Sequence, residues 1–342
     1  MKEIAVLGAG SWGTALAVSL SKKGLNIKMW CRDEEQALKI VKTRENVKYL
    51  PGVILPHNIN VVTNLNEAVK NVDFIVIAVP THGIRELLRK LIHLLTPTTI
   101  LVNTAKGIEP DTLLRLSEVF QEEIPGISER LCILSGPSHA EEVGRDMPTT
   151  VVAAATTRKV AEIVQDIFIT PKFRVYTNPD VIGVEVGGAL KNVIALATGI
   201  SDGLGFGDNT KAALITRGMT EIARLGVKMG ANPLTFAGLT GIGDLVVTCN
   251  SMHSRNRRAG IALGQGKKLD VVLREMGMVV EGVRTTQAVK MLGEKYQVDL
   301  PIAFEVYNVL FNGVNPEEGV VNLMTRIKTH EMEEVVTNKI EW

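Results

Sequence analysis

Short apolar runs alternate with helical patterns along the first half of the chain, and this alternation constrains the fold more than any other feature. Five runs of the buried-strand type end in turn residues, and they are EIAVLGAG, NIKMWCR, NVDFIVIAVP, TTILVNTAK and LCILSGPS. Helical stretches such as TALAVSLSKKG and HGIRELLRKLIHLL separate them. Strands that alternate with helices form a parallel sheet covered on both faces. TTVVAAAT is expected to extend the sheet, a helix over 158–168 to follow, and FRVYTNP to add an edge strand.

The pattern changes at Pro179. Beyond it strand-like runs nearly vanish, and helical patterns rich in Ala, Gly and Leu continue toward the C-terminus. We therefore predict an α/β domain with a parallel sheet over residues 1–180 and an all-helical domain over residues 181–342. The last residues, TNKIEW, are expected to form a loosely held tail.

A glycine motif directly follows the first predicted strand and opens a helix. Gly8, Gly10 and Gly13 have the GxGxxG spacing, which allows a tight turn, close approach of the backbone to a pyrophosphate, and close packing of helix on strand. The helix N-terminus adds amide donors and the positive end of its dipole. The motif predicts dinucleotide binding on a Rossmann-type domain, and the alternative is a purely structural turn.

The second predicted strand ends at Arg32 and Asp33, where such domains read the ribose of the cofactor. An acid at this place suits the ribose hydroxyls of NAD, whereas an arginine suits the 2′-phosphate of NADP. Arg32 therefore favours NADP, while Asp33 leaves NAD open. The alternative is that Arg32 covers the adenine without reading a phosphate.

Two further strand ends carry polar segments, and ligands of open parallel sheets bind at the carboxyl ends of strands. Lys106 follows the strand TTILVN and is placed to meet an anionic or carbonyl oxygen, with a solvated loop lysine as the alternative. Ser138 follows LCILSGP and is expected to cap the helix that begins at HAEEV, to touch a ligand, or both.

Lys191 lies within GVEVGGALKNVIALATGI, a stretch that is apolar on almost every face of a helix. Glu185 and Lys191 make a membrane-spanning helix a poor interpretation, so we expect a buried helix of a globular domain. Burial lowers the pKa of a lysine, and a lysine beside an acid such as Asp244 is suited to donate a proton to a carbonyl. The alternative is a structural Lys–Asp ion pair.

A compact basic patch, SRNRR, begins at Ser254. An arginine fork with nearby amides suits a phosphate, and the alternative is a solvated, basic start of a helix. Glu281 lies beside an apolar run and has no assignment from the residues alone.

Composition excludes several classes of function. The net charge of +1 argues against a broad nucleic-acid surface. Cys31, Cys132 and Cys249 are too far apart for a CxxC pair, and no metal-ligand spacing occurs. The N-terminus starts a strand at once, without a signal-type leader. We expect a cytoplasmic protein without metal, nucleic acid or membrane insertion, and a homodimer is left open.

Seven segments together resemble one family. They are GAGSWGTALA, NTAKGIE, LSGPSHAEEV, GGALKNVIALATG, GLTGIGDLVVTC, SRNRRAG and VEGVRTT, which follow one another in family order without a break. On these motifs the chain is similar to the bacterial-type NAD(P)-dependent glycerol-3-phosphate dehydrogenases from residue 1 to about residue 330.

The resemblance implies reversible reduction of dihydroxyacetone phosphate to sn-glycerol 3-phosphate, the backbone precursor of phospholipids. It makes Lys191 the proton donor in reduction and acceptor in oxidation, with Asp244 as the second catalytic residue. The substrate pocket would be completed by Lys106, Gly136, Ser138, Ser254, Arg255 and Asn256. The cofactor would touch Ser11, Trp12, Arg32, Lys106, Ala140, Arg255 and Glu281, besides the three glycines. NAD or NADP would serve, and Arg32 favours NADPH.

Two other functions fit part of the sequence. Dehydrogenases of 3-hydroxy acids or of ketopantoate also pair a Rossmann domain with a helical domain and a helix lysine, but the SRNRR patch suits a phosphate better than a lone carboxylate. A dinucleotide-sensing regulator would have no need of a buried lysine facing an aspartate.

Overall fold

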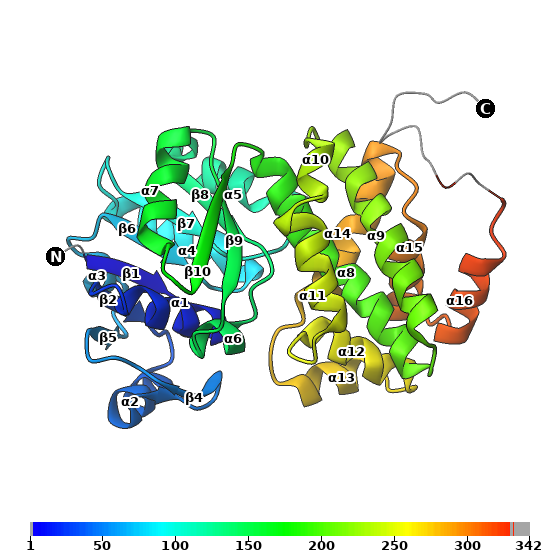
Figure 1. Ribbon diagram of the computed structural model, residues 1–342, viewed down its shortest axis with the longest axis horizontal. Coiled ribbons are helices and arrows are strands. Elements are labelled where there is room, and N and C mark those ends of the chain that lie inside the picture. The colour runs from blue at the N-terminus through cyan, green and yellow to red at the C-terminus, as the bar shows by residue number, and fades with distance from the viewer. Residues whose placement is uncertain (1–2, 329–330, 332–342) are drawn as a thin grey trace. The chain divides into compact units, whose positions relative to one another are not determined.

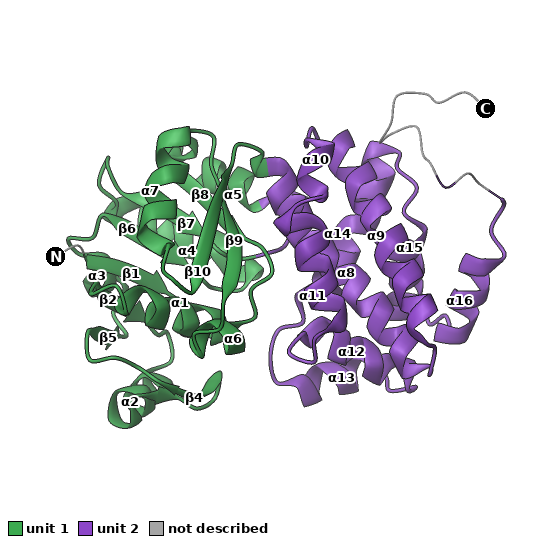
Figure 2. Ribbon diagram, in the orientation of Figure 1, with its two compact units in different colours: residues 1–105, 116–181 green, residues 106–115, 182–342 purple. Residues whose placement is uncertain are grey.

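The structure, a computed structural model, describes residues 3–328 and residue 331 (Figure 1). Its chain divides into two compact units (Figure 2). Unit 1 comprises residues 1–105 and 116–181, and unit 2 comprises residues 106–115 and 182–342. The segment 106–115 therefore groups with the helical unit, although the sequence prediction had placed it within the first domain. The predicted tail, TNKIEW, lies outside the described residues.

Unit 1 is built on an eight-stranded sheet with the order β10-β9-β8-β7-β6-β1-β2-β5. The strands are β1 (Glu3–Leu7), β2 (Asn26–Trp30), β5 (Ile59–Val62), β6 (Phe74–Ile77), β7 (Ile100–Asn103), β8 (Leu131–Ser135), β9 (Thr149–Ala154) and β10 (Phe173–Asn178). A separate two-stranded sheet joins β3 (Glu45–Asn46) to β4 (Leu50–Ile54). All seven predicted strands are confirmed, including β10 at the edge, whereas β3, β4 and β5 were not predicted.

One pairing departs from the predicted parallel sheet. β8 pairs with β9 in the antiparallel sense, while the other pairs of the large sheet are parallel. A parallel crossover needs a dozen or more residues and usually a full helix. The connection from β8 to β9 contains only the five-residue helix α6 (Ala140–Gly144), whereas β9 and β10 are joined through the eleven-residue helix α7 (Arg158–Phe168), as predicted.

Helices cover both faces of the large sheet. Besides α6 and α7 they are α1 (Ser11–Ser21), α2 (Glu34–Thr43), α3 (Leu65–Val69), α4 (Ile84–Leu91) and α5 (Leu116–Glu123). Figure 1 shows α1 and α7 in front of the sheet and α4 and α5 behind it. The β1 side chains alternate accordingly, since Ile4 and Val6 join the core under α1 and α7 while Ala5 and Leu7 face the other way.

Apart from the segment 106–115, the regular structure of unit 2 is helical in its described part. After α8 (Val181–Gly203) come α9 (Asp208–Lys228), α10 (Pro233–Phe236), a π-helical turn (Leu239–Gly243), α11 (Asp244–Asn250), α12 (Arg255–Gly264), α13 (Leu269–Met276), α14 (Glu281–Tyr296), α15 (Pro301–Phe311) and α16 (Pro316–Met324). The Rossmann-type sheet domain with a helical partner domain is confirmed as the fold class.

Helix α8 is the centre of unit 2, and every residue from Gly183 to Ser201 is buried. It is long and apolar enough to cross a membrane, but 89% of its most apolar 18-residue window is buried inside the structure. That burial is what the core helix of a globular unit shows. The helix bundle therefore explains its apolar composition.

Candidate functional site

The turn between β1 and α1 can be built only with glycine at two positions. Gly8 has a φ of +118°, and a Cβ there would lie 2.6 Å from the Ala78 carbonyl oxygen. A Cβ on Gly13 would lie 1.9 Å from the carbonyl oxygen of Gly8. At Gly10, by contrast, a Cβ would meet no atom within 4 Å, so this side of the turn is open. Two glycines shape the turn, and the third leaves space at the helix start for a ligand.

The N-terminus of α1 has the features of an anion site. Its N-cap, Gly10, offers no side-chain acceptor, and the first turn carries no acidic residue. The turn is fixed from below, because Gln36 Nε2 and Asn46 Nδ2 donate to the Ala9 carbonyl at 2.7 and 2.9 Å. Asn46 also donates to Thr14 Oγ1 at 2.8 Å. Amide donors and the positive end of the helix dipole therefore meet open space, which fits the pyrophosphate of a dinucleotide.

Asn46 and Gln36 were missed in the sequence. Asn46 is 1% exposed and comes from the short β3 strand, which no periodic pattern marks. A buried asparagine next to a weak strand carries no signal of its own. Only its hydrogen bonds to the glycine turn show its role.

The end of β2 separates Arg32 from Asp33. Arg32 is exposed, whereas the carboxylate of Asp33 accepts the amide of Gln36 at 3.0 Å and caps α2. A carboxylate that caps a helix has one oxygen already engaged. Trp12, in the first turn of α1, is partly buried against the core of unit 1.

The segment after β8 holds Gly136, Ser138 and Ala140. Gly136 has a φ of +135°, and a Cβ on it would lie 3.0 Å from the Val151 Cα. The predicted helix cap by Ser138 is wrong, because α6 starts after His139 without a side-chain cap. The Ser138 hydroxyl instead donates to the Gly136 carbonyl at 2.9 Å, which closes the local turn.

Unit 2 brings three of the predicted residues into direct contact. Lys191 Nζ donates to Asp244 Oδ1 at 2.5 Å, and Lys106 Nζ donates to Asp244 Oδ2 at 2.7 Å. Lys191 also donates to Thr248 Oγ1 at 2.7 Å, and that hydroxyl lies 2.6 Å from the Asp244 carbonyl, to which it donates. One carboxylate thus holds two ammonium groups. Thr248 was missed, because a threonine within an apolar helical run has no motif.

Helix α8 reaches this carboxylate because its glycines let other backbone come close. A Cβ on Gly187 would lie 2.5 Å from the Thr240 carbonyl oxygen, in the π-helical turn that precedes Asp244. Such wide turns are frequent at functional sites. Here the turn starts α11, so that Asp244 in its first turn faces Lys191.

Opposing effects set the pKa values of this cluster. Burial lowers the pKa of Lys191, the Asp244 charge raises it, and the Lys106 charge lowers it again, with a result of about 8. Burial alone would raise the pKa of Asp244, but the charges of Lys106 and Lys191 outweigh burial and hold it below its usual value. Near neutral pH the carboxylate is ionised, and the buried ammonium gives up its proton easily.

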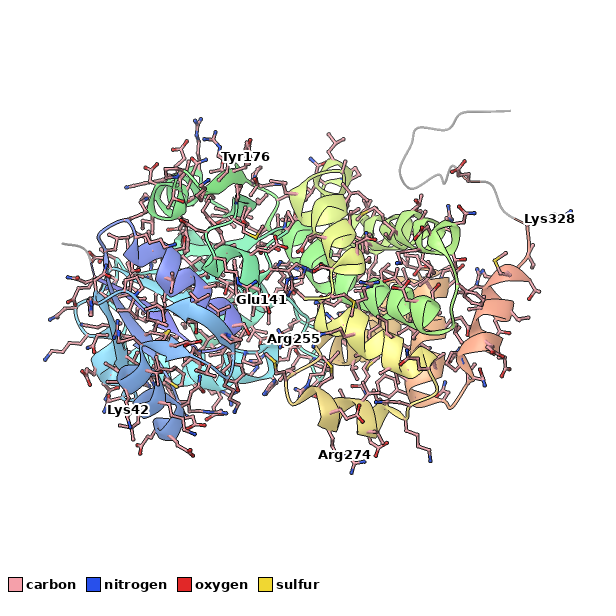
Figure 3. All side chains as sticks on the ribbon, turned by 60° about the horizontal axis from the view of Figure 1, so that its bottom comes forward. Lys42, Glu141, Tyr176, Arg255, Arg274 and Lys328 are labelled. Carbon is pink, nitrogen blue, oxygen red and sulfur yellow. The ribbon has the colours of Figure 1, made fainter. Side chains whose placement is uncertain are left out.

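The basic patch divides into parts with different partners. Ser254 caps α12 by accepting the Arg257 amide at 3.2 Å, and Arg255 Nη1 donates to the Val279 carbonyl at 3.0 Å. Arg257 is an ion-pair residue, with Nη2 2.7 Å from Asp202 Oδ2. In Figure 3, Arg255 lies on α12, whereas Arg274 extends outward from α13. Arg255 is the first residue of α12, whereas Arg257 in the same turn is engaged by Asp202.

Asn256 ties the patch to the lysine helix. Its Nδ2 donates to Asn192 Oδ1 at 2.9 Å, and its Oδ1 accepts the Gly282 amide at 2.9 Å. Asn192 directly follows Lys191 in α8, and Gly282 follows Glu281 in the first turn of α14. Three helix segments with predicted site residues are thus joined by one buried amide.

A cavity of about 770 Å³ in unit 2 contains none of the predicted site residues. Its lining is mostly apolar and comes largely from α9, α15 and α16, with side chains such as Leu214, Val306 and Leu323. The site is therefore located by its ionisable groups, and cavity size does not mark it. Among residues 3–328 and 331, no group of three or more His, Cys, Asp or Glu side chains gathers as a metal site would.

A glycine turn for a dinucleotide on a Rossmann-type unit, and a buried lysine with a lowered pKa in a helical unit, define a two-domain NAD(P)-dependent dehydrogenase. Residues 3–161 match the family model described as the N-terminus of NAD-dependent glycerol-3-phosphate dehydrogenase, and residues 180–321 match the model of its C-terminus. The chain belongs to this family.

Individual relatives agree with that assignment. The glycerol-3-phosphate dehydrogenase [NAD(P)+] of Pelotomaculum thermopropionicum is 60% identical over 335 residues, which cover 97% of this chain and 96% of the relative. The Bacillus subtilis protein of the same name is 57% identical over 98% of both chains. A crystal structure of glycerol-3-phosphate dehydrogenase from Coxiella burnetii superposes with a TM-score of 0.91 at 36% identity, covering 95% of this chain and 99% of that one.

Proposed function

We propose that the chain catalyses the reversible NAD(P)H-dependent reduction of dihydroxyacetone phosphate to sn-glycerol 3-phosphate. The observation that carries this proposal is the buried contact of Lys191 with Asp244, in a chain that belongs to the glycerol-3-phosphate dehydrogenase family. Family membership favours a phosphorylated substrate over the hydroxy-acid and ketopantoate alternatives. A regulator without turnover would not need the proton donor.

When bound, a nicotinamide cofactor would supply the hydride for the ketone carbon. As the carbonyl oxygen gains charge, the N–H bond of the Lys191 ammonium breaks and an O–H bond forms, which leaves a neutral amine. Asp244 is the positioning residue, because it holds the Lys191 ammonium and stays ionised. Lys106 holds the other oxygen of Asp244 and adds positive charge near the developing oxyanion.

Arg255 and Asn256 are proposed to hold the substrate phosphate. Arg255 offers a planar fork at the N-terminus of α12, where the helix dipole also favours an anion. Asn256 keeps one amide hydrogen after its bond to Asn192, and Ser254 begins the helix. Gly136 and Ser138 of unit 1 are proposed to complete the substrate pocket.

The cofactor is proposed to bind over the glycine turn of unit 1, with Ser11, Trp12, Arg32 and Ala140 around it. Lys106, Arg255 and Glu281 of unit 2 are proposed as its further contacts. NADPH is proposed to serve at least as well as NADH, because Arg32 is exposed at the end of β2 while Asp33 is engaged as the cap of α2. Family members of this kind use NAD or NADP.

Steady-state kinetics with dihydroxyacetone phosphate tests the proposal, with NADH and NADPH side by side and unphosphorylated dihydroxyacetone as the comparison substrate. We expect turnover with the phosphorylated ketone only. Lys191→Met should keep the apolar stem and the fold, and turnover should fall by about 10²–10⁴-fold. A folded Lys191→Met protein with near-parent turnover would refute the role of Lys191, and parent turnover on dihydroxyacetone would refute phosphate recognition.

If Lys191 and Asp244 were only a structural pair, removing the lysine would take one of two ammonium groups from the buried Asp244 carboxylate and leave Lys106 as its ion-pair partner. The loss of stability would then be appreciable, up to the roughly 3–5 kcal/mol of a fully broken buried pair. Melting temperature and kcat measured on one preparation of Lys191→Met therefore separate the two roles.

The metabolic and cellular setting of this reaction is also proposed. The product would supply glycerophospholipid synthesis in the cytoplasm, where the buried thiols of Cys31, Cys132 and Cys249 would stay reduced. Depletion of the chain in its host should then create a requirement for glycerol 3-phosphate.

A homodimer is proposed because α16 exposes Val321 and Met324, and a monomer mass in sedimentation at all concentrations would exclude it.

A further inference from the structure

The segment 106–115 leaves the chain of unit 1 after β7 and belongs to unit 2. It folds back on itself, since Ile108 and Arg115 form an antiparallel bridge and the Glu109 amide donates to the Leu114 carbonyl at 3.0 Å. Ile108 is 2% exposed and belongs to the core of unit 2, against which Leu113 also packs. We call residues 106–115 the returning loop.

Both ends of the returning loop form ion pairs with carboxylates of unit 2. At its start Lys106 contacts Asp244, and at its end Arg115 Nη1 lies 2.7 Å from Glu185 Oε2. The Arg115 and Glu185 side chains are 12% and 4% exposed. Glu185 lies on α8, the same helix that carries Lys191. The returning loop therefore contacts Asp244 through its first residue, Lys106, and contacts α8 through its last residue, Arg115.

A buried ion pair is a poor source of stability. Removing two charges from water costs about as much as their attraction returns, and replacing such a pair with apolar side chains is often neutral or stabilising. The contacts of Ile108 and Leu113 already attach the loop to the core. The ion pair adds a fixed orientation of the returning loop relative to α8, because an arginine guanidinium binds a carboxylate in few orientations.

We propose that Arg115 and Glu185 are positioning residues, which hold the returning loop on unit 2 so that the Lys106 ammonium stays on Asp244. This inference rests on the proposed function of the Lys106, Asp244 and Lys191 cluster. Arg115 is bridged to Ile108, two residues after Lys106, so the pair with Glu185 fixes the part of the loop from which Lys106 reaches Asp244. A loop that shifts by about 1 Å would take the ammonium out of hydrogen-bond range, and misplacement of that size costs up to about 10²-fold in rate.

Displacement of Lys106 has a second consequence. The groups that act on Lys191 are Asp244 and Cys249 of α11 and Lys106 of the returning loop, and among their charges that of Lys106 lowers the pKa of Lys191. If the Lys106 ammonium moves away, the pKa of Lys191 rises. The pH above which reduction declines should then move upward. A loss of stability alone would not move it.

The test replaces both partners, Arg115→Met with Glu185→Leu, so that no charge is left buried and unpaired. We expect the melting temperature to stay near that of the parent, kcat/KM for dihydroxyacetone phosphate to fall about 10- to 100-fold, and the basic limb of the pH profile to move upward. The same changes in the Lys106→Met background should alter kcat/KM less than about 2-fold, because the residue they position is already gone.

A matched control removes a partly buried Arg–Glu pair of unit 1, Arg85→Met with Glu123→Leu. Arg85 Nη1 lies 2.6 Å from Glu123 Oε1, with 20% and 13% exposed side chains. This variant should leave the pH limb of reduction unchanged. If the first double variant fails to fold, Glu185→Asp keeps the charge and shortens the side chain, and it should lower kcat/KM and move the limb in the same direction.

Three outcomes would overturn the inference. The folded Arg115→Met, Glu185→Leu protein could keep the kcat/KM of the parent, or its loss in kcat/KM could be equally large in the Lys106→Met background. The third is a Glu185→Asp protein whose basic limb of the pH profile stays at the position found for the parent. Failure of the proposed function looks different. In that case the parent protein itself would not turn over dihydroxyacetone phosphate, and with an active parent, Lys106→Met at the parent kcat/KM would refute the role of Lys106 alone.

Discussion

At the scale of the residue, Lys191 shows how a buried charge can be held ready to react. Burial lowers the pKa of Lys191, the Asp244 carboxylate raises it, and the Lys106 ammonium on the same carboxylate lowers it again. The resulting pKa of about 8 lies well below the usual lysine value, 10.5, and close to neutral pH. A general acid is most efficient when its pKa is near the working pH.

The pH dependence follows from that value. Reduction needs the protonated lysine, so kcat/KM for dihydroxyacetone phosphate should fall as pH rises through about 8. Oxidation of glycerol 3-phosphate needs the neutral amine, so its kcat/KM should rise through the same pH. Profiles measured in both directions check this, with Lys191→Met as the control whose residual activity lacks the limb. Limbs that run in the same sense in both directions would contradict the assignment.

Cofactor choice also belongs to a single residue. Arg32→Ala should raise the KM for NADPH about 10-fold or more, because a charge-assisted hydrogen bond to phosphate contributes roughly 1.5–3 kcal/mol. The KM for NADH should change little, since NADH has no 2′-phosphate. Lys42 is an exposed cation on α2 and provides the control (Figure 3). Lys42→Ala should change neither the KM for NADPH nor the KM for NADH. Equal losses for both cofactors would show that Arg32 stacks on the adenine without reading the phosphate.

At the scale of the element, close packing of α12 on α8 sets the distance between the basic patch, which is proposed to hold the substrate phosphate, and the helix that carries Lys191. A Cβ on Gly260 of α12 would lie 2.3 Å from the Leu196 carbonyl oxygen and 2.8 Å from the Gly199 Cα, both in α8. The two helices can come this close only because both residues at the contact, Gly260 and Gly199, are glycines without a Cβ. The same contact keeps Asn256 in reach of Asn192.

Gly260→Ala should therefore push α12 away from α8. We expect a loss of about 1–3 kcal/mol in stability, as for other overpacked cores, together with a higher KM for dihydroxyacetone phosphate. Denaturant unfolding and steady-state kinetics check both effects. Gly207→Ala is the matched control, because a Cβ there meets no atom within 4 Å. A Gly260→Ala protein with the parent KM would show that the helix distance does not position the patch.

The sequence predicted elements well where local periodicity is strong. The buried strand β6 is apolar at every position and β1 at every position after Glu3, and the buried helix around Lys191 is apolar on almost every face. Strand direction was not predictable, since the apolar pattern of β9 is the same in either sense. β5 was missed because its four residues, INVV, include a polar asparagine and only two of them are buried, so they form no apolar run.

The site was predictable to the extent that motifs mark it. The glycine turn and the contact of Lys191 with Asp244 follow recognisable segments, whereas Thr248 and Asn46 act through hydrogen bonds between residues far apart in sequence. The returning loop is a third case. Its grouping with unit 2 depends on Ile108 and the Arg115 pair with Glu185, and two such contacts in ten residues leave no periodic pattern.

At the scale of the whole molecule, the chain passes between its two units at 105/106, 115/116 and 181/182. Each unit has its own apolar core and its own part of the chemistry: the glycine turn in unit 1, the lysine cluster in unit 2. Because of this division, cofactor binding and proton transfer can be tested separately.

NADPH at about 100 times its Kd should stabilise the native state by roughly 2.7 kcal/mol. For a unit of this size, this corresponds to a rise of about 5–10 °C in the melting transition to which unit 1 contributes. Lys191→Met should show the same rise while its turnover is lost, because Lys191 belongs to unit 2 and the glycine turn is unchanged. Scanning calorimetry with and without NADPH, on parent and variant, measures both. If the NADPH-dependent rise disappeared in a folded Lys191→Met protein, cofactor binding would depend on the lysine cluster, and the proposed division of labour between the units would be wrong.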